Sequence, residues 1–442
     1  MSAAPSARHA HVASWARGRG AAVLGGALLV VVALGLCGPA RAQGVEAPAW
    51  TLFDAGAYHL SLLYGGPADV APRHLLPAAR ADLEARCAGR PDCPAAWGAA
   101  ALHGVAVALD DPHTSVLDAA GFARVRLQLA GGATAREIGA VLTAPADGLG
   151  FGVLDVVPDS SAATSGLRRG DRILALDGAY LPAIRADRWG AGRAATGVGT
   201  VEATVLRHGA APRTVVLEAT DVALDRAPSA TTLPSGAVWL RLPSFLPAND
   251  VAHRVHALVA EAERSGASAL VVDLRDNPGG AIVDCLLAAT AFTPEAGRVL
   301  TSAVTRQTVV AGAGSVAVTD AAGRTFPQAT LEAPARWTGA VAVLVNEGSA
   351  SCAEFLALDL QRAGATVVGE PTAGAADSST AFVALPFGYG LQVSTARVAG
   401  LVGLASPSAV APDVGVEDAP LALAEGRDPV LEAALAILTD PR

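Results

Sequence analysis

Two turns in the C-terminal half of the sequence carry residues that could stabilise a negative charge. An apolar run at 270–274 leads into RDNPGG at 275–280, and a second run at 341–346 leads into EGSASCAE at 347–354. Ser351 falls at the start of a predicted helix, where free backbone N–H groups and the helix dipole favour an anion. Adjacent glycines let the chain approach closely and add a donor, so the two turns outline an oxyanion hole.

A second interpretation of the same serine is structural. Ser351 and Glu354 have the S-x-x-E spacing of a capping box, which needs no catalysis to explain it. The neighbouring Cys352 offers a third interpretation, a thiol nucleophile. One residue along a helix turns the side chain by about 100°, so Ser351 and Cys352 cannot both face one substrate.

The elements that must position these turns alternate between strands and helices. This alternation predicts parallel strands joined by right-handed crossovers, with a site at the carboxyl ends of the strands. We therefore predict an α/β core over residues 223–442, with His253 and His256 on the solvated face of its first helix. The strands are predicted at 238–242, 269–274, 341–345 and 366–368, and the helices at 250–265, 281–291 and 352–363.

Two further regions precede this core. Residues 43–130 alternate apolar helical stretches with turns, which predicts a small helical domain. Residues 131–222 contain short β-runs between turns, which predicts a compact β-rich module. A multidomain α/β protein fits 442 residues at about 150 residues per domain. The β-runs lie at 151–157, 172–176, 201–207 and 213–217.

The β-rich module resembles a PDZ domain. The resemblance rests on GLGFG at 148–152 opening a strand, followed by SSAATSGLRRGDRILALDG at 160–178. The alternative is that these glycines only serve tight turns. The resemblance implies that the free C-terminus of a polypeptide binds to the backbone N–H groups of Leu149, Gly150, Phe151 and Gly152.

The set of motifs along residues 50–440 resembles the tail-specific, or C-terminal processing, serine peptidases. This resemblance implies that Ser351 is the nucleophile and that Gly279, Gly280 and the amide of Cys352 support the oxyanion. The motifs are LDDPHTSVLD at 109–118, DLRDNPGG at 273–280, VNEGSASCAE at 345–354, VVGEPTAG at 367–374 and a closing PDVGVED…GRDPVLEAALAIL.

The family's usual catalytic base is missing. Its best-known members carry a lysine directly after the G-E-x-T-x-G turn and a glutamine four residues later, whereas this chain has Ala375 and Ser379 there and contains no lysine. Relatives of the tricorn protease type use a histidine in the segment that here reads DDPHT, which implies His113 as the base. An imidazole with an ordinary pKa near 6.5 can accept a serine proton at neutral pH.

An acid is expected to orient His113. Asp377 is our first choice, Asp110 and Asp111 are alternatives, and an exposed turn carboxylate is the structural alternative for Asp377. No group of His, Cys and Asp has metal-ligand spacing, and no phosphate-binding glycine loop occurs. We therefore expect no metal and no cofactor.

Residues 1–42 have the order of a secretory signal peptide: Arg8, Arg17 and Arg19, an apolar run at 21–36, and small residues before a cut at Gln43. An uncut anchor is the alternative, although the run is shorter than the about 20 residues of a membrane span. Cleavage removes four Arg and no acid, so the net charge changes from −9 to −13. Nucleic acid is an unsuitable partner for this charge, and no membrane span is expected after cleavage.

Export to the periplasm or the medium favours disulfides. Cys87 and Cys93 flank a Gly/Pro turn and are expected to be bonded, a free pair being the alternative. Cys285 and Cys352 lie in apolar helical patterns and are expected to be small buried residues.

These expectations predict an exported serine peptidase that recognises polypeptides through their C-termini. The alternative is a catalytically inactive, PDZ-containing scaffold or adaptor that binds peptides. The two differ in whether a base lies beside Ser351.

Overall fold

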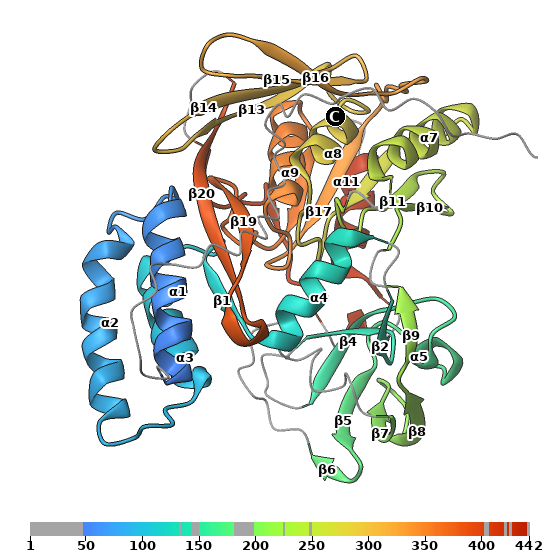
Figure 1. Ribbon diagram of the computed structural model, residues 1–442. Coiled ribbons are helices and arrows are strands. Elements are labelled where there is room, and N and C mark those ends of the chain that lie inside the picture. The colour runs from blue at the N-terminus through green and yellow to red at the C-terminus, as the bar shows by residue number, and fades with distance from the viewer. Residues whose placement is uncertain are drawn as a thin grey trace, which may run out of the picture.

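The computed structural model describes residues 47–131, 134–143, 150–180, 199–223, 226–246, 250–401, 406–419, 422–423 and 427–439 (Figure 1). The predicted signal peptide and the predicted peptide-binding residue Leu149 lie outside these ranges. Within the described part of the chain, no helix has both the length and the apolar character needed to cross a membrane.

A six-stranded sheet forms the centre of the C-terminal region. Its strand order is β10-β11-β12-β17-β18-β21, and all neighbours are parallel except β10 and β11. The predicted α/β class and parallel core are therefore confirmed. The strands are β10 (Ser229–Thr232), β11 (Val238–Arg241), β12 (Leu270–Asp273), β17 (Val341–Val345), β18 (Thr366–Gly369) and β21 (Val414–Gly415).

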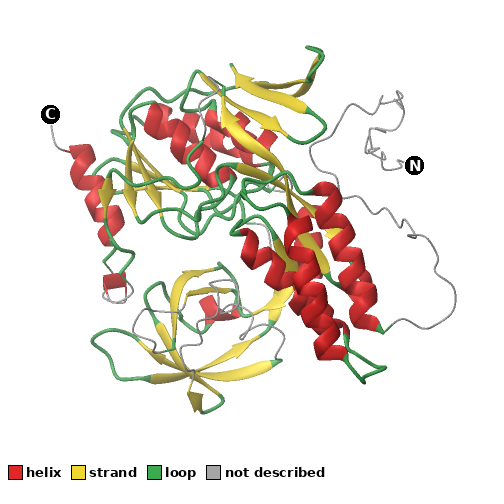
Figure 2. Ribbon diagram, turned by 90° about the vertical axis from the view of Figure 1, so that its left-hand side faces the viewer, coloured by secondary structure: helices red, strands yellow, loops and turns green. Residues whose placement is uncertain are grey.

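This sheet is buried on both faces because alternate residues of a strand point to opposite sides. Val343 and Val345 of β17 pack in the main core, whereas Ala342 and Leu344 pack in a separate cluster on the other face. The main core contains residues of α7 (Val251–Arg264), α8 (Ile282–Ala289) and α9 (Cys352–Arg362), and the other cluster those of α11 (Pro429–Thr439) (Figure 2).

The sequence pattern does not indicate a second, antiparallel sheet of seven strands. Its order is β1-β20-β13-β14-β15-β16, and β19 also pairs with β20. Val309 and Ala311 join the main core, so this sheet covers the helices of the α/β layer (Figure 1). The strands are β1 (Ser115–Leu117), β13 (Glu295–Thr301), β14 (Arg306–Gly312), β15 (Ser315–Thr319), β16 (Thr325–Thr330), β19 (Ser378–Ala384) and β20 (Gly390–Gly400).

The helical region packs against β20 and does not close on itself. Leu52 and Leu102 lie in one buried cluster with Leu391 and Val393 of β20. The predicted disulfide between Cys87 and Cys93 is present, and Cys285 and Cys352 are free and buried as expected. The helices are α1 (Pro48–Leu63), α2 (Pro72–Cys87), α3 (Ala95–Leu109) and, after β1, α4 (Ala119–Ala130).

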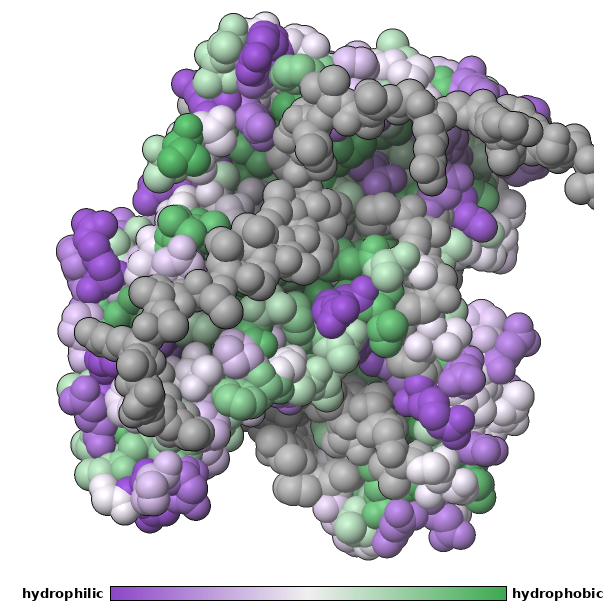
Figure 3. Space-filling model, viewed as in Figure 1, coloured by the Kyte–Doolittle hydropathy of each residue, from purple (hydrophilic) through white to green (hydrophobic). Residues whose placement is uncertain are grey.

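The β-rich module has a separate apolar core that includes Phe151, Ile173 and Leu217. In the space-filling view, the module and the helical region form two lobes with an open notch between them (Figure 3). The module contains the β2–β9 pair (Thr134–Glu137 and Thr220–Ala223), β3 (Ala140–Thr143), β4 (Phe151–Val156), α5 (Ser161–Thr164), β5 (Arg172–Leu176), β6 (Ala179–Tyr180), β7 (Thr200–Leu206) and β8 (Arg213–Glu218).

The expectation for His256 is wrong. His253 is exposed, but His256 is buried, with Nδ1 accepting from Ala335 N at 3.0 Å and Nε2 lying 3.1 Å from Leu287 O. The ring thus fills the contact between α7 and α8. Charged neighbours in the sequence do not reveal which way one helical position points.

Gly98 of α3 provides a test of how closely α1 and α3 pack. A Cβ at Gly98 would lie 2.1 Å from the backbone oxygen of Ala49. We therefore expect Gly98→Ala to lower the free energy of unfolding by about 1–3 kcal/mol, although alanine is ordinarily the better helix former.

Gly104 on the same helix is the matched control, because a Cβ there meets no atom. Gly104→Ala is expected to stabilise by up to about 1 kcal/mol. Denaturant unfolding measures both variants, and a stable Gly98→Ala protein would contradict the close contact.

Candidate active site

Ser351 lies where β17 passes into α9, in a strained backbone conformation. It is the residue before the first turn of α9, with φ 55° and ψ −115°. The predicted capping box between Ser351 and Glu354 is present, but a serine that merely caps a helix has extended backbone angles, so capping alone does not account for this conformation. Non-glycine residues in such regions cost about 1–3 kcal/mol and concentrate at functional sites.

Glu354 holds this turn in place. Its buried carboxylate accepts the Ser351 N–H at 2.6 Å and the Ala375 N–H at 2.9 Å on Oε2. On Oε1 it accepts the Thr372 hydroxyl at 2.6 Å and the Gly374 N–H at 2.9 Å. Burial raises the pKa of Glu354, while these hydrogen bonds oppose the rise. One carboxylate thus joins the start of α9 to the GEPTAG turn at residues 369–374.

The NPGG turn lies directly against Ser351. A Cβ on Gly279 would lie 2.8 Å from Ser351 Cβ and 3.0 Å from Cys352 N, and φ at Gly279 is +91°. The Gly279 N–H is occupied, because it donates to Asn277 Oδ1 at 2.8 Å. The N–H groups of Gly280 and Cys352 have no acceptor within the described residues. Gly279 therefore provides close approach, and Gly280 and Cys352 provide the available donors.

The two cysteines support this turn from inside. The Cys352 thiol donates to Gly280 O at 3.5 Å, and Cys285 lies beside it. Burial raises the pKa of the Cys285 thiol well above its usual value. Both side chains are buried, which fits packing and not nucleophilic attack.

His113 lies in the loop between α3 and β1 and is buried. Its N–H donates to Asp111 Oδ1 at 3.0 Å, and its ring Nδ1 lies 2.8 Å from Ser378 Oγ. Burial lowers the pKa of His113 to about 4, although the charge of Asp111 acts in the opposite direction. The ring is therefore neutral at pH 7, and the ordinary value of 6.5 assumed from the sequence is wrong for this site.

The structure brings His113 to the turn that borders Ser351 but not into contact with Ser351. His113 contacts Ser378, which follows Ala375 by three residues, and Ala375 shares Glu354 with Ser351. Among the described residues, no hydrogen bond joins the His113 ring to the Ser351 hydroxyl.

Asp377 is half-buried and also makes no hydrogen bond to His113 within the described residues. Burial and the nearby charge of Asp111 raise the pKa of its carboxyl. Asp111 itself bonds the loop, accepting from the His113 N–H and the Thr114 hydroxyl. Neither carboxylate thus holds the ring.

A buried ionic cluster connects the RDNPGG turn at 275–280 to the β-rich module. The fully buried guanidinium of Arg275 bonds Asp273 at 2.8 Å, Asp428 at 2.9 Å and Asp418 at 3.3 Å. Arg169 of the module reaches the same Asp418 at 3.3 Å. Although burial alone would raise it, the adjacent Arg275 holds the pKa of Asp273 well below its usual range.

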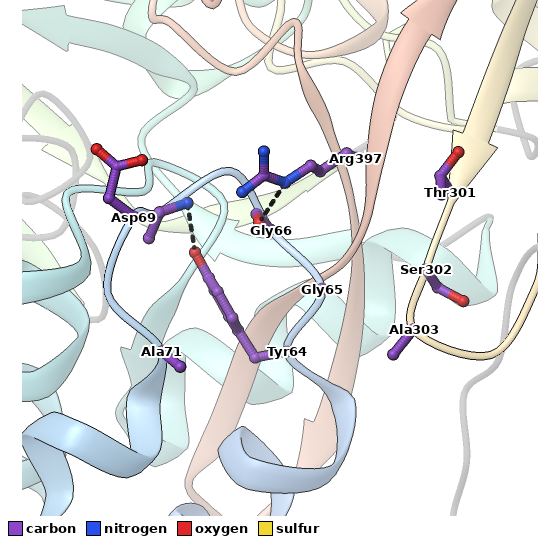
Figure 4. Close-up of a pocket in the computed structure, with 10 residues that line it drawn as sticks. Tyr64, Gly65, Gly66, Asp69, Ala71, Thr301, Ser302, Ala303 and Arg397 are labelled. Atoms are coloured by element: carbon purple, nitrogen blue, oxygen red, sulfur yellow. Dashed lines mark hydrogen bonds between the residues drawn. The ribbon is translucent and has the colours of Figure 1, made fainter.

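A pocket of about 340 Å³ borders the His113 loop (Figure 4). The loop after α1, the end of β13 and Arg397 of β20 form its walls. Arg397 donates from Nε to Gly66 O at 3.1 Å, and a Cβ on Gly66 would lie 2.7 Å from Asp111 Oδ2. The pocket wall and the His113 loop are therefore in direct contact.

Residues 237–416 match peptidase family S41, a range that contains Ser351 and the NPGG turn but not His113. This part of the chain is therefore similar to the peptidases of family S41. A carboxyl-terminal-processing protease of Synechocystis sp. is 32% identical over 248 residues, 54% of this chain and 52% of that protein. One of Picosynechococcus sp. is 28% identical over 296 residues, 65% of each chain. The chain thus spans about half and about two-thirds, respectively, of the length of these two relatives.

The fold is also similar to that of a solved protease. The photosystem II D1 C-terminal processing protease superposes with a TM-score of 0.52 and 21% identity, over 89% of this chain and 98% of that one. At this identity the likeness concerns the fold alone. It extends beyond the matched family region to include the N-terminal part of the chain.

Three residues of the site are not singled out by the sequence patterns. Asn277 accepts a hydrogen bond from the Gly279 N–H, and Ser349 donates to Leu274 O at 2.8 Å. The third residue, Ser378, contacts His113. Asn277 and Ser349 lie inside the motifs, where a turn must satisfy its own backbone groups. Ser378 directly follows Asp377, and only the alternation of side chains along β19 could have pointed to it.

Replacing Glu354 tests whether its charge assembles the site. Glu354→Gln keeps the shape but presents an NH₂ group to N–H donors, so two of the four partners lose their acceptor. We expect the free energy of unfolding to fall by about 1–3 kcal/mol, and labelling of Ser351 by a serine-directed phosphonate to fall with it. Glu261→Gln, on the exposed face of α7, is the control and should change stability by less than about 0.5 kcal/mol. A Glu354→Gln protein with unchanged stability and unchanged labelling would show that the charge of Glu354 does not assemble the site.

Proposed function

We propose that this protein is an exported serine peptidase that cleaves polypeptides recognised through their C-termini. The observation that carries the proposal is the strained Ser351, packed against Gly279 beside two N–H groups that have no acceptor within the described residues. A nucleophile and pre-positioned donors for an oxyanion are the two requirements of acyl transfer. The match of residues 237–416 to peptidase family S41 supports this chemistry.

In the proposed reaction, Ser351 Oγ attacks the scissile carbonyl carbon while its proton passes to Nε2 of His113. The tetrahedral oxyanion accepts hydrogen bonds from the N–H groups of Gly280 and Cys352. His113 then returns the proton to the leaving amine, and water hydrolyses the acyl-enzyme by the same route.

His113 must approach Ser351 when substrate binds, because the hydrogen bond between them is not formed in the free protein. Catalytic hydrogen bonds commonly shorten only in the substrate complex. The missing hydrogen bond between His113 and Ser351 also supports the rival function, a peptide-binding scaffold that does not cleave. Mutation of the pair separates the two functions.

Ser351→Ala, His113→Ala and the double variant form the deciding test. If the two side chains act as one unit, the cleavage rates of all three variants should fall to a similar residual value, because the loss of either side chain disables the same step. Cleavage of an unfolded polypeptide gives the rate, and phosphonate labelling reports Ser351 directly. Undiminished cleavage by Ser351→Ala would exclude the proposed peptidase function. An active His113→Ala protein would show that His113 is not the base, and Asp377 and its neighbours would be tested next.

We assign capture of the substrate C-terminus to the β-rich module, at Leu149, Gly150, Phe151 and Gly152. Gly150 supports this, since it enters β4 with φ +67° and a Cβ there would lie 2.2 Å from Ile173 O. Only glycine allows the backbone this conformation at this distance. The disulfide between Cys87 and Cys93 supports export, because such bonds persist in oxidising compartments.

Peptide amidation tests this capture. Converting the C-terminal carboxylate of a bound peptide to an amide removes a charge-assisted contact to the backbone N–H groups. Binding should weaken by roughly 1.5–3 kcal/mol, measured by titration calorimetry with the Ser351→Ala protein. An internal Asp-to-Asn change in the same peptide controls for charge alone. Equal affinity for the acid and amide peptides would contradict the assignment.

A further inference from the structure

The imidazole of His113 has one side-chain hydrogen-bond partner within the described residues, and it is a hydroxyl. Nδ1 lies 2.8 Å from Ser378 Oγ, and both residues are buried, with exposed fractions of 5% and 1%. The other ring nitrogen, Nε2, has no partner among the described residues. The contact at Nδ1 thus leaves Nε2 as the nitrogen that can exchange a proton.

Ser378 is fixed in place on both sides. It is the first residue of β19, where it pairs with Arg397 of β20, and it follows the GEPTAG turn that Glu354 holds. The register of β19 against β20 shifts between Ser379 and Thr380. Such irregularities redirect side chains, and here the Thr380 hydroxyl donates to His113 O at 3.2 Å. Two hydroxyls of β19 therefore hold the ring and the backbone of His113.

We propose that Ser378 is the positioning residue of His113, taking the place that an acid was expected to fill. The proposal rests on the function proposed above, because it matters only if His113 is the base. Ser378 touches neither substrate nor nucleophile and acts through the histidine alone.

The hydroxyl can serve both states of the ring as an acceptor, because a neutral ring whose Nε2 is free to take a proton carries its hydrogen on Nδ1. When Ser351 gives its proton to Nε2, the imidazolium carries hydrogen on both nitrogens, and the Nδ1–H donates to Ser378 Oγ. When Nε2 passes that proton to the leaving amine, the ring is neutral again and the contact persists. The hydroxyl adds no charge, so it orients the ring without stabilising the imidazolium as strongly as a carboxylate would.

Other charged groups also face this site. Asp111 lies in the same loop with the Tyr64 hydroxyl beside it, Asp377 precedes β19, and Arg397 extends from β20. Of these, Asp111 acts on His113 in favour of the charged ring, and burial outweighs it. The low pKa of His113 agrees with a neutral partner at Nδ1.

The experiment compares Ser378→Ala, Ser378→Thr and Ser378→Asp in the purified full chain. We expect kcat of Ser378→Ala to fall about 10–100-fold with KM unchanged. The acid limb of its pH–rate profile, where kcat falls as His113 is protonated, should move to lower pH because the imidazolium loses its acceptor. Ser378→Thr keeps a hydroxyl and should recover most of the rate. Ser378→Asp should move the acid limb upward by at least one pH unit, since a carboxylate favours the charged ring.

Ser379→Ala is the matched control. The Ser379 hydroxyl makes no hydrogen bond within the described residues, whereas the hydroxyl of the adjacent Ser378 contacts His113. The Ser379→Ala protein should retain the wild-type rate and pH profile. Thermal unfolding of each variant shows whether the strand remains folded. A stable Ser378→Ala protein with the wild-type rate and acid limb would overturn the inference, and so would a pH profile unchanged in both Ser378→Ala and Ser378→Asp.

The two proposals fail in different ways. If Ser351→Ala still cleaves, the peptidase function itself is wrong. If Ser351→Ala and His113→Ala are inactive but Ser378→Ala is normal, the peptidase stands and only the role of Ser378 is lost. Loss of the acid limb on Asp377→Asn alone would assign the orienting role to that carboxylate instead.

Discussion

The buried carboxylate of Glu354 is the interaction on which the rest of the site depends. It accepts hydrogen bonds from Ser351 on one side and from Thr372, Gly374 and Ala375 on the other. A buried carboxylate is costly unless its oxygens are satisfied, so the two segments must reach it together. The start of α9 and the start of β19 are therefore placed by one group. Through Ser378, the same constraint extends to His113, which lies in a loop far away in the sequence.

A second buried charge lies in the turn that borders Ser351. Arg275 begins the RDNPGG turn at 275–280, and its guanidinium needs the carboxylates of Asp273, Asp418 and Asp428 to be buried at all. Because Arg169 shares Asp418, the β-rich module contributes a partner to this cluster. The N–H groups around Ser351 thus depend on how the module sits against the core, whereas the place of His113 depends on the antiparallel sheet.

The parts of the site that were predictable are those encoded locally. The core strands are buried on both faces and appear as continuous apolar runs, and the turns after β12 and β17 carry their glycines and Ser351 within a few residues. The contact between His113 and Ser378 joins residues 265 positions apart, and no local pattern encodes it. Strands β14 and β15 alternate buried and partly buried residues, and β16 is largely exposed, so these strands lack the long apolar runs of the core. The pKa of His113 follows from burial, which only the folded chain determines.

The absence of lysine and the neutral histidine belong to one electrostatic arrangement. Ala375 is 2% exposed and gives its N–H to Glu354. Glu354 is thus satisfied by dipoles and hydroxyl groups and needs no cation beside it. A neutral imidazole can be buried next to such a site at small desolvation cost, whereas an unpaired ammonium could not. A hydroxyl at Nδ1 completes this arrangement, because it adds no charge to a site that already contains the carboxylates of Asp111 and Asp377.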